Sequence, residues 1–355
     1  MMKLAREWNR FWFEPGPASN LGLCRLLFFG MLCVWMFPHD FSAWGSYSRV
    51  FWMPVSLFRV AHIGPLPVDA LFIVQAVWKA SLAFAAIGLF ARPAMIVAAL
   101  LGFYLMGLPH NFGQTQHFDT LVVLSMGALA LSRAGDAYSA DAWLGRNGRR
   151  TSECDAEYTW PIRFVWVAMS LIFFAAGISK LRHSGLDWIF SDSFSLFLLR
   201  QQYHISDGDP LTTWGIVVAH HPWLSHAMAA SAVTVETLFP IVLFSRRARL
   251  VLVPAGLLFL VGIRLLMGPT FEQFMMCYVF WVPWDRVAVI VRGYAHTDSG
   301  RVSAVPRRDG VFAATRTDSG REPTRYRHLP RAAHRRRWND HGREAREHDG
   351  EPRLR

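Results

Sequence analysis

Apolar runs follow one another along this chain up to about residue 292, and short polar segments separate them. A helix that crosses a bilayer needs about 20 mostly apolar residues, because lipid offers its backbone no hydrogen-bond partners. By this criterion the sequence predicts about eight transmembrane helices. They fall near residues 20–37, 68–90, 94–109, 118–132, 161–181, 223–244, 250–267 and 271–291.

Composition supports the same class. Hydrophobic residues make up 52% of the chain, aromatic residues 14% and charged residues only 18%, which is unlike an ordinary soluble enzyme. The first apolar run leads to no small-residue cleavage site, so we interpret it as a membrane span and not as a signal peptide. We therefore predict an all-α fold, a polytopic helix bundle over residues 1–292 that crosses the cell membrane several times.

The distribution of Lys and Arg predicts the orientation, because cytoplasmic loops carry the excess of these residues. With the N-terminus inside, the outer loops hold only Arg49, Arg59, Arg182 and Arg200. The inner side then holds Lys3, Arg6, Arg10, Arg92, Arg133, Arg146, Arg149, Arg150, Arg246, Arg247 and Arg249. An even number of spans with both termini in the cytoplasm fits this asymmetry.

Residues 293–355 differ from the rest of the chain. This segment contains fifteen Arg, no Lys, nine Asp or Glu and few aliphatic residues. It cannot bury enough apolar surface to offset the entropy of ordering, so we predict a disordered, Arg-rich cytoplasmic tail. Its arginine runs lack interleaved aromatic residues for base stacking, and we expect no nucleic-acid partner.

Ionisable residues within or beside the spans are candidates for function, because each one is costly in a bilayer. The topology places eight of them at the outer boundary, where they predict a polar pocket: His110, His117, Asp119, Lys180, His183, Asp187, Arg264 and Glu272. The alternative is that these residues have purely structural roles. Lys180 and Arg264 would extend to the lipid headgroups, and Asp119 and Glu272 would cap helix N-termini.

Lys180 is the strongest catalytic candidate, since a lysine in a dry environment becomes a usable base near neutral pH. Glu236 lies midway along the predicted sixth span and needs a partner of its own. The sequence places Lys79 at a similar depth, so we predict a Lys79–Glu236 pair that stabilises the bundle.

Residues 191–203, SDSFSLFLLRQQY, predict a short amphipathic helix in an outer loop.

Three stretches indicate a family: HNFGQTQHFDTLVVL at 110–124, LALSRAGDAYSADAWL at 129–144 and FFAAGISKLRHSGLDW at 173–188. Together they resemble the horizontally transferred transmembrane domain family, which includes the membrane portion of vitamin K-dependent gamma-carboxylase. The third stretch is the most specific, because a Gly, a Lys (Lys180) and a Trp (Trp188) recur in it at the end of a span. The likeness covers residues 5–292.

The resemblance implies that Lys180 is the base that deprotonates reduced vitamin K or another quinol, and that His117 assists the addition of carbon dioxide. Substrate-binding roles would fall on His110, Asp119, His183, Asp187, Trp188 and Arg264. Two positions differ from the carboxylase: Ser179 replaces a second lysine, and Gln116 replaces an asparagine before His117. The likeness does not extend to the large extramembrane domain that helps the carboxylase bind its glutamyl protein substrate.

Two classes of function remain open at this point. The first is a membrane enzyme of the gamma-carboxylase or quinol epoxidase type, with a quinone and a secreted peptide or protein as partners besides the lipid bilayer. The second is a non-catalytic membrane protein in the export or maturation of a secreted peptide, or in immunity to it. A transporter is less favoured because no internal repeat is visible. No metal is expected, since His220, His221 and His226 are separated by a helix-starting proline.

Overall fold

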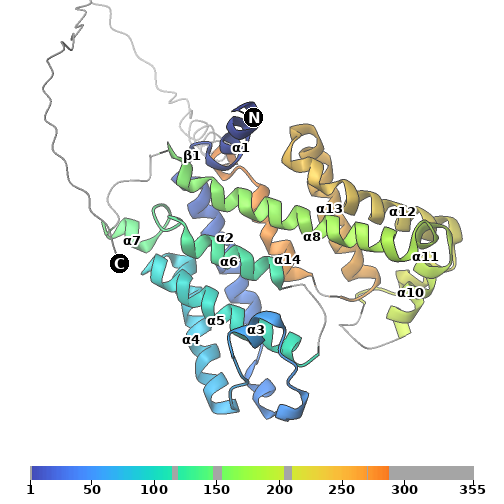
Figure 1. Ribbon diagram of the computed structural model, residues 1–355, viewed down its shortest axis with the longest axis horizontal. Coiled ribbons are helices and arrows are strands. Elements are labelled where there is room, and N and C mark those ends of the chain that lie inside the picture. Colours follow the sequence, from blue (N-terminus) through green and yellow to red (C-terminus); the bar gives the residue numbers. More distant parts are fainter. Residues whose placement is uncertain (1, 114–118, 147–153, 204–209, 270, 288–355) are drawn as a thin grey trace, which may run out of the picture. The chain divides into compact units, whose positions relative to one another are not determined.

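Long helices dominate the computed structural model, which describes residues 2–113, 119–146, 154–203, 210–269 and 271–287 (Figure 1). Six of the described helices are long and apolar enough to cross a bilayer. They are α2 (Ala18–Met36), α4 (Val68–Ile87), α5 (Ala91–Asn111), α8 (Trp160–Ser184), α12 (Pro222–Leu238) with its 3-10 continuation η4 (Phe239–Leu243), and α13 (Arg246–Leu266). Proline in the first turn of α8 and of α12 matches its preference for a position where no amide hydrogen bond is lost.

Shorter elements connect these helices. They are α1 (Met2–Phe13), β1 (Gly16–Pro17), η1 (Ser42–Ser46), η2 (Arg49–Phe51), α3 (Ser56–Val60), α6 (Thr120–Leu131), α7 (Ala140–Trp143), β2 (Cys154–Asp155), η3 (Ala156–Tyr158), α9 (Asp187–Phe190), α10 (Ser193–Tyr203), α11 (Trp214–Ala219), α14 (Glu272–Met276) and η5 (Cys277–Trp281). Strands β1 and β2 pair antiparallel, with Gly16 opposite Asp155. The helix predicted from SDSFSLFLLRQQY is α10, which confirms that prediction.

The predicted helical membrane bundle is confirmed, but the count of eight spans is not. The predicted fourth span is α6, a helix of 12 residues, which is too short to cross about 30 Å of hydrocarbon at 1.5 Å per residue. The predicted eighth span is divided between α14 and η5, each of 5 residues. Conversely, α5 and α13 have 21 residues each and are longer than predicted. The side of the membrane that each terminus occupies stays a prediction, and residues 293–355 lie outside the described part of the chain.

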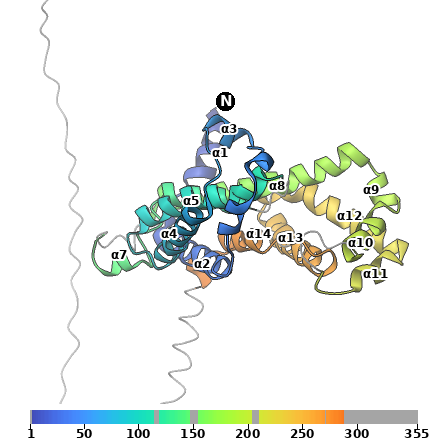
Figure 2. The same ribbon diagram turned by 90° about the horizontal axis from the view of Figure 1, so that it is seen from below.

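The helices form two packed groups, which are joined by contacts between α6 and α8. In one group, α4 packs on α2 and α5, and α5 packs on α6. In the other, α8 packs on α12 and η4, and α12 contacts α13. Helix α6 contacts α8 and so joins the two groups. Seen from below, α4, α5 and α7 lie on one side and α9, α10 and α11 on the other (Figure 2).

Large apolar side chains cover the outside of the long helices as well as filling the core. Phe72, Leu100, Leu171 and Leu258 are each between 59% and 70% exposed. Extended apolar surface of this kind is unfavourable in water, but it is the surface that hydrocarbon chains contact. The exposed residues therefore agree with helix length in assigning the bundle to a bilayer.

Arg25 connects the helices at one end of the bundle. Its side chain is fully buried, and its guanidinium donates five hydrogen bonds to backbone carbonyls. The acceptors are Ala85 and Ala86 at the end of α4, and Ala134, Ala137 and Tyr138 in the loop after α6. Gly88 ends α4 with φ +71°, and a Cβ there would lie 2.6 Å from Arg25 Nη1, so this turn requires glycine.

A second charged side chain completes this end. The buried carboxylate of Asp141 accepts hydrogen bonds from the amides of Phe90 (3.1 Å) and Ala91 (2.7 Å) at the start of α5, where a negative charge is favoured. Asp141 also attracts Arg25 electrostatically. Arg25 and Asp141 together hold α2, the turn between α4 and α5, and the loop after α6.

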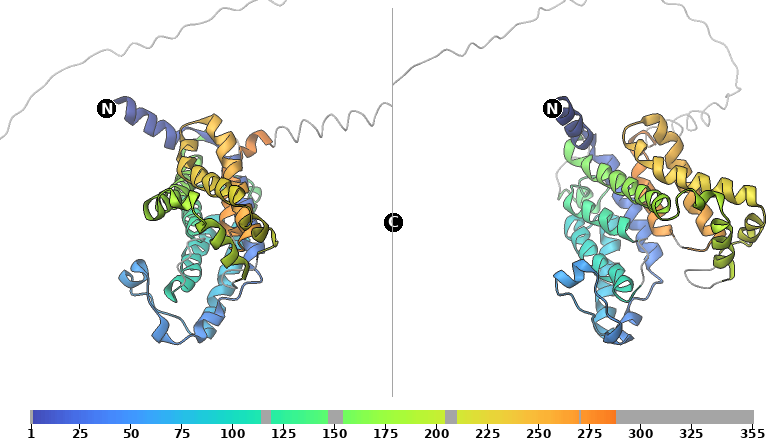
Figure 3. Two further views of the ribbon diagram at one scale, coloured as in Figure 1. Left: turned by 90° about the vertical axis from the view of Figure 1, so that its right-hand side faces the viewer. Right: turned by 45° about the vertical axis from the view of Figure 1, so that its right-hand side comes forward.

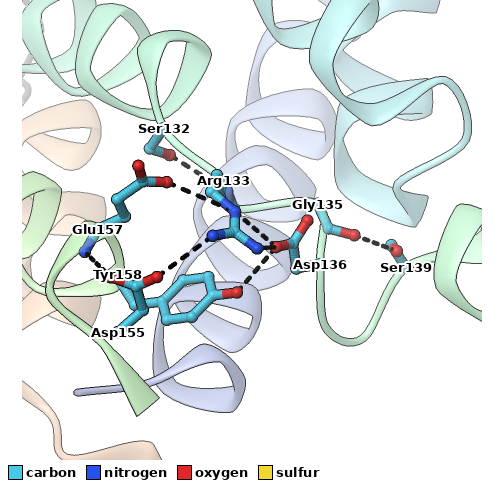
Figure 4. A network of polar contacts seen from close by, with 9 residues as sticks. Ser132, Arg133, Gly135, Asp136, Ser139, Asp155, Glu157 and Tyr158 are labelled. Carbon is cyan, nitrogen blue, oxygen red and sulfur yellow. Dashed lines mark hydrogen bonds and ion pairs between the residues drawn. The ribbon is translucent and has the colours of Figure 1, made fainter. Parts of the chain in front are cut away.

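A network around Arg133 lies in the same loop (Figure 4). The guanidinium of Arg133 is 2.7 Å from a carboxylate oxygen of Asp136 and 3.3 Å from one of Asp155, and it contacts Glu157 at 3.5 Å. The Tyr158 hydroxyl donates to Asp136 at 2.8 Å. Because Asp155 belongs to β2, this network fixes the strand pair to the helix ends that Arg25 holds.

We predict that Arg25→Met lowers the stability of the purified protein strongly. The variant leaves five backbone carbonyls, four of them in buried hydrogen bonds, without their donor. Hydrogen bonds from a charged donor contribute about 1.5–3 kcal/mol each, so we expect a loss of at least about 3 kcal/mol. Thermal unfolding in detergent, followed by tryptophan fluorescence, measures the change. Arg200→Met is the matched control, because Arg200 is exposed on α10. Equal melting temperatures for the two variants would contradict the role assigned to Arg25.

Candidate functional site

Lys180 and Glu236 form an ion pair between α8 and α12. The Lys180 ammonium lies 2.8 and 2.7 Å from the two carboxylate oxygens of Glu236. The Glu236 side chain is 4% exposed and that of Lys180 is 25% exposed. A buried carboxylate needs such a partner, so Glu236 holds Lys180 in one position.

Gly177 allows this pairing. It lies about one turn before Lys180 on α8, and a Cβ at this position would lie 2.9 Å from the Thr237 amide nitrogen and 3.0 Å from the Glu236 Cβ. Only glycine lets the two backbones approach so closely. Gly177 and Lys180 therefore act together. Gly177 allows α12 to approach α8 closely, and Lys180 forms the ion pair with Glu236 of α12.

The predicted Lys79–Glu236 pair is wrong. Lys79 instead donates hydrogen bonds to the carbonyls of Phe37 (2.9 Å) and His39 (2.6 Å), at the start of the first predicted outer loop. Asp40 is close by and accepts from the Ser42 hydroxyl and amide and from Gln75; these hydrogen bonds and the charge of Lys79 hold its pKa below the usual range. Lys79 therefore positions this loop. The prediction compared only the depths of Lys79 and Glu236 in the bilayer, which are similar. The two side chains point toward different partners.

An apolar cavity opens beside the ion pair. Its volume is about 390 Å³, within the range of small-molecule sites. Aromatic side chains from α8, α9, α10, α13, α14 and the residue before α14 make up much of its wall: Phe173, Trp188, Phe194, Phe197, Phe259, Phe271 and Phe274. Lys180, Glu236 and Gln201 are the charged or amide side chains in the lining. A few polar groups in an aromatic wall can orient a ligand that is otherwise apolar.

Trp188 is part of this wall. Its ring lies 6.0 Å from the Lys180 ammonium, at the limit of a cation–π contact. Its indole nitrogen is buried and has no hydrogen-bond acceptor among the residues that the structure describes. An indole N–H of this kind is free to donate to a ligand. The structure thus brings together two of the predicted site residues, Lys180 and Trp188.

Other predicted site residues lie outside the cavity wall. Arg264 pairs with Glu272 at 3.0 Å and donates to the Gly268 carbonyl at 2.9 Å, so it fixes the turn between α13 and α14. Ile263 and Met267, which flank Arg264, do line the cavity. Arg264 therefore supports the wall from behind and does not contact its contents.

His183 and Asp187 are exposed at the end of α8 and the start of α9. The His183 ring nitrogen Nδ1 lies 2.8 Å from the Ser179 carbonyl oxygen, one turn earlier. Neither residue lines the cavity. In the described geometry they lie at the connection between α8 and α9, and direct ligand contact by either one stays a prediction.

The histidines near α5 and α6 form another group. Asp119 precedes α6 and interacts electrostatically with His110, at the end of α5, and with His39. Neither His110 nor Asp119 lines the cavity beside Lys180. His117 lies outside the described residues, so its predicted role is not tested. Among the described residues, Lys180, Arg264 and Asp119 have different electrostatic partners: Glu236 for Lys180, Glu272 for Arg264, and His110 and His39 for Asp119.

Sequence reasoning missed Glu236 as the partner of Lys180 and the aromatic wall from α10. Gly177 was the available signal for the first, since a glycine one turn before a charged residue permits close helix approach. For the second, Phe194, Phe197 and Gln201 recur at helical spacing in the predicted amphipathic helix. Within the described segments, no cluster of three or more His, Cys, Asp or Glu side chains is arranged to hold a metal ion.

The fold defines a class of protein: a multi-pass helical membrane protein with a ligand-sized cavity at the end of two of its long helices. No protein-family model, no curated protein and no solved structure matches this chain. Membership of the horizontally transferred transmembrane domain family accordingly stays a prediction from the three sequence stretches.

We predict energetic coupling between Lys180 and Glu236. Lys180→Met and Glu236→Leu should each lower the free energy of unfolding by roughly 1–3 kcal/mol, a range reduced for the partial exposure of Lys180, because each leaves the other charge without a partner. The double variant should lose less than the sum of the two. Thermal unfolding of the four proteins measures the coupling.

A second double-mutant cycle, with Lys79→Met and Glu236→Leu, is the matched control. It tests the Lys79–Glu236 pair that the sequence alone predicted. Its two changes should add without coupling, because the structure gives Lys79 and Glu236 different partners. Coupling in the Lys79 cycle and none in the Lys180 cycle would contradict the observed pair.

Proposed function

We propose that this chain is a membrane enzyme that binds a lipid-soluble reduced quinone in the cavity and takes up a proton from it. The observation that carries the proposal is the Lys180–Glu236 ion pair, which lies in the wall of an aromatic cavity at the end of a membrane helix. The resemblance of residues 173–188 to the gamma-carboxylase membrane domain favours the same assignment for Lys180.

The ion pair can act as one acid–base unit. In its charged form the Lys180 ammonium is no base, but it lies 2.7 Å from a carboxylate oxygen that can accept a proton. Lys180 would pass one proton to Glu236 and receive the proton of the quinol hydroxyl in return. The ammonium would then remain beside the oxygen that becomes negative, where a nearby positive charge stabilises it most in a dry site.

The cavity has the features that a quinol requires. Flat rings pack well against the phenylalanines of its wall, and such contacts contribute beyond the buried area. The buried indole N–H of Trp188 and the amide of Gln201 are hydrogen-bonding groups for a ring oxygen. Reduced vitamin K or another quinol of similar size is the proposed substrate, with dioxygen as the oxidant: one quinol and one dioxygen give one quinone epoxide and one water.

Carboxylation of a secreted peptide or protein is the further step that the family resemblance implies. It depends on His117, and its support is the sequence resemblance alone. The cell membrane is the proposed location, with the cavity on its outer face and both termini in the cytoplasm, because the loops with few Lys and Arg lie on that side.

The test is formation of quinone epoxide by the purified protein supplied with vitamin K hydroquinone and air. Lys180→Ala should lower the rate at least about 100-fold, the usual contribution of a positioned base. Glu236→Gln should lower it as well, because the amide cannot store the proton. Arg182→Ala is the control, since Arg182 is an exposed cation near Lys180 that does not line the cavity.

Binding of the hydroquinone is measured in parallel by quenching of tryptophan fluorescence. A Lys180→Ala variant that binds but forms epoxide at the wild-type rate would refute the assignment of the base. Binding without epoxide formation in the wild-type protein would refute the enzyme and favour the alternative, a non-catalytic partner in export, maturation or immunity.

A further inference from the structure

Three arginines converge at the opposite end of α8 from Lys180. Arg163, in the first turns of α8, lies 4.4 Å from the Trp166 ring, and Arg249, in the first turn of α13, lies 4.2 Å from the same ring. Trp166 stacks on Trp281 at 4.5 Å, with the rings nearly parallel. Arg246 is close enough to act electrostatically on both Arg163 and Arg249. We call Arg163, Arg246 and Arg249 the arginine cluster.

Little negative charge balances this cluster. Glu14 contacts Arg163 at 3.4 Å, a long ion pair with a half-exposed carboxylate. The guanidinium of Arg249 donates to a neutral group, the Val242 carbonyl, at 3.0 and 3.2 Å. Arg246 is exposed and forms no ion pair with any residue in the described ranges. Three positive charges therefore face one carboxylate.

The position of the cluster makes this imbalance larger. Ser245 caps α13, and the helix opens with Arg246, Arg247 and Arg249 in its first turn. The N-terminal end of a helix carries a partial positive charge and unpaired amides, so cations are disfavoured there and anions are favoured. An external anion would offset both the mutual repulsion of the arginines and the helix dipole.

The side chains around the arginine cluster indicate which kind of molecule would carry this anion. Phe244, Leu250 and Val251, next to the cluster along the chain, are 87%, 78% and 67% exposed. Helix α1 contacts α8 and exposes Trp8 and Phe13. In both views of Figure 3, α1 is drawn at the same end of the bundle as the turn before α13. Apolar side chains beside a cationic group match a molecule with a phosphate head and acyl chains.

We propose that the arginine cluster is a binding site for the phosphate of an anionic phospholipid, whose acyl chains lie along the exposed apolar side of α13. Arg246 and Arg249 bind the phosphate oxygens, and Arg163 adds positive charge from α8. Lys180 follows Arg163 by 17 positions in the sequence, which is about 25 Å along a helix. The lipid site and the quinol site are therefore at opposite ends of α8, and neither proposal depends on the other.

The test uses the full chain, purified in a neutral detergent and freed of bound lipid. Phosphatidylglycerol, phosphatidylcholine and inorganic phosphate are titrated separately, and native mass spectrometry measures the fraction of protein with bound ligand. We expect phosphatidylglycerol to bind most tightly and inorganic phosphate not to bind at the same concentrations. Arg246→Gln should weaken phosphatidylglycerol binding about fivefold, the contribution of one arginine near an anionic headgroup.

Arg247→Gln is the matched control. Arg247 is exposed in the same helical turn and carries the same charge, but it is not among the arginines that act on Arg163 and Arg249. This variant should keep the wild-type affinity, and Arg246→Lys should keep most of it. Because Arg246 is exposed, its replacement leaves the packing around Trp166 unchanged.

Three results would overturn the proposal. Equal binding of phosphatidylcholine would remove the need for a net negative charge. Binding of inorganic phosphate as tight as that of phosphatidylglycerol would assign the cluster to a free anion. An equal loss of affinity in Arg247→Gln and Arg246→Gln would show a diffuse positive surface in place of a defined site.

Discussion

The buried guanidinium of Arg25 is the constraint on which the rest of the bundle depends. A fixed positive charge inside an apolar helix is stable only if its donors are satisfied, and in this protein five backbone carbonyls satisfy them. Those carbonyls become available only where helices end. Helix α4 must therefore stop at Gly88, and the chain after α6 must return across α2. One charged side chain thereby determines where two helices terminate and how they lie against a third.

Because Arg25 is buried near one end of the bundle, the two ends of the bundle differ. At the Arg25 end, Asp141, Arg133 and a strand pair close the structure with charged groups that are satisfied by their neighbours. Near the far end of α8, the Lys180–Glu236 pair borders a cavity of about 390 Å³. A rigid end and an open end suit a membrane site, since the first fixes the helices and the second leaves room for a ligand.

Sequence alone identified most of the helices, because runs of about 20 apolar residues have few other stable structures. It underestimated α5 and α13, whose first residues are polar and looked like loop, and it could not show that α6 is short or that η5 follows α14 closely. Lys180 was predicted from its place at the end of a span and Trp188 from the family resemblance, and both line the cavity. Glu236 was given the wrong partner because hydropathy fixes a residue's depth in the membrane but not its direction around the helix axis. That direction depends on helix packing, and in this protein on the close contact at Gly177.

The two ion pairs considered for Glu236 also explain why one lysine is a candidate for chemistry and the other is not. Lys79 donates hydrogen bonds to two carbonyl oxygens, which cannot be protonated near neutral pH, so its role is to hold the loop after α2. Lys180 donates hydrogen bonds to the Glu236 carboxylate, which can be protonated. Transfer of one proton from Lys180 to Glu236 would leave both side chains neutral. In the proposed reaction, Lys180 therefore exchanges a proton with a bound hydroxyl through Glu236, and Lys79 has no equivalent partner.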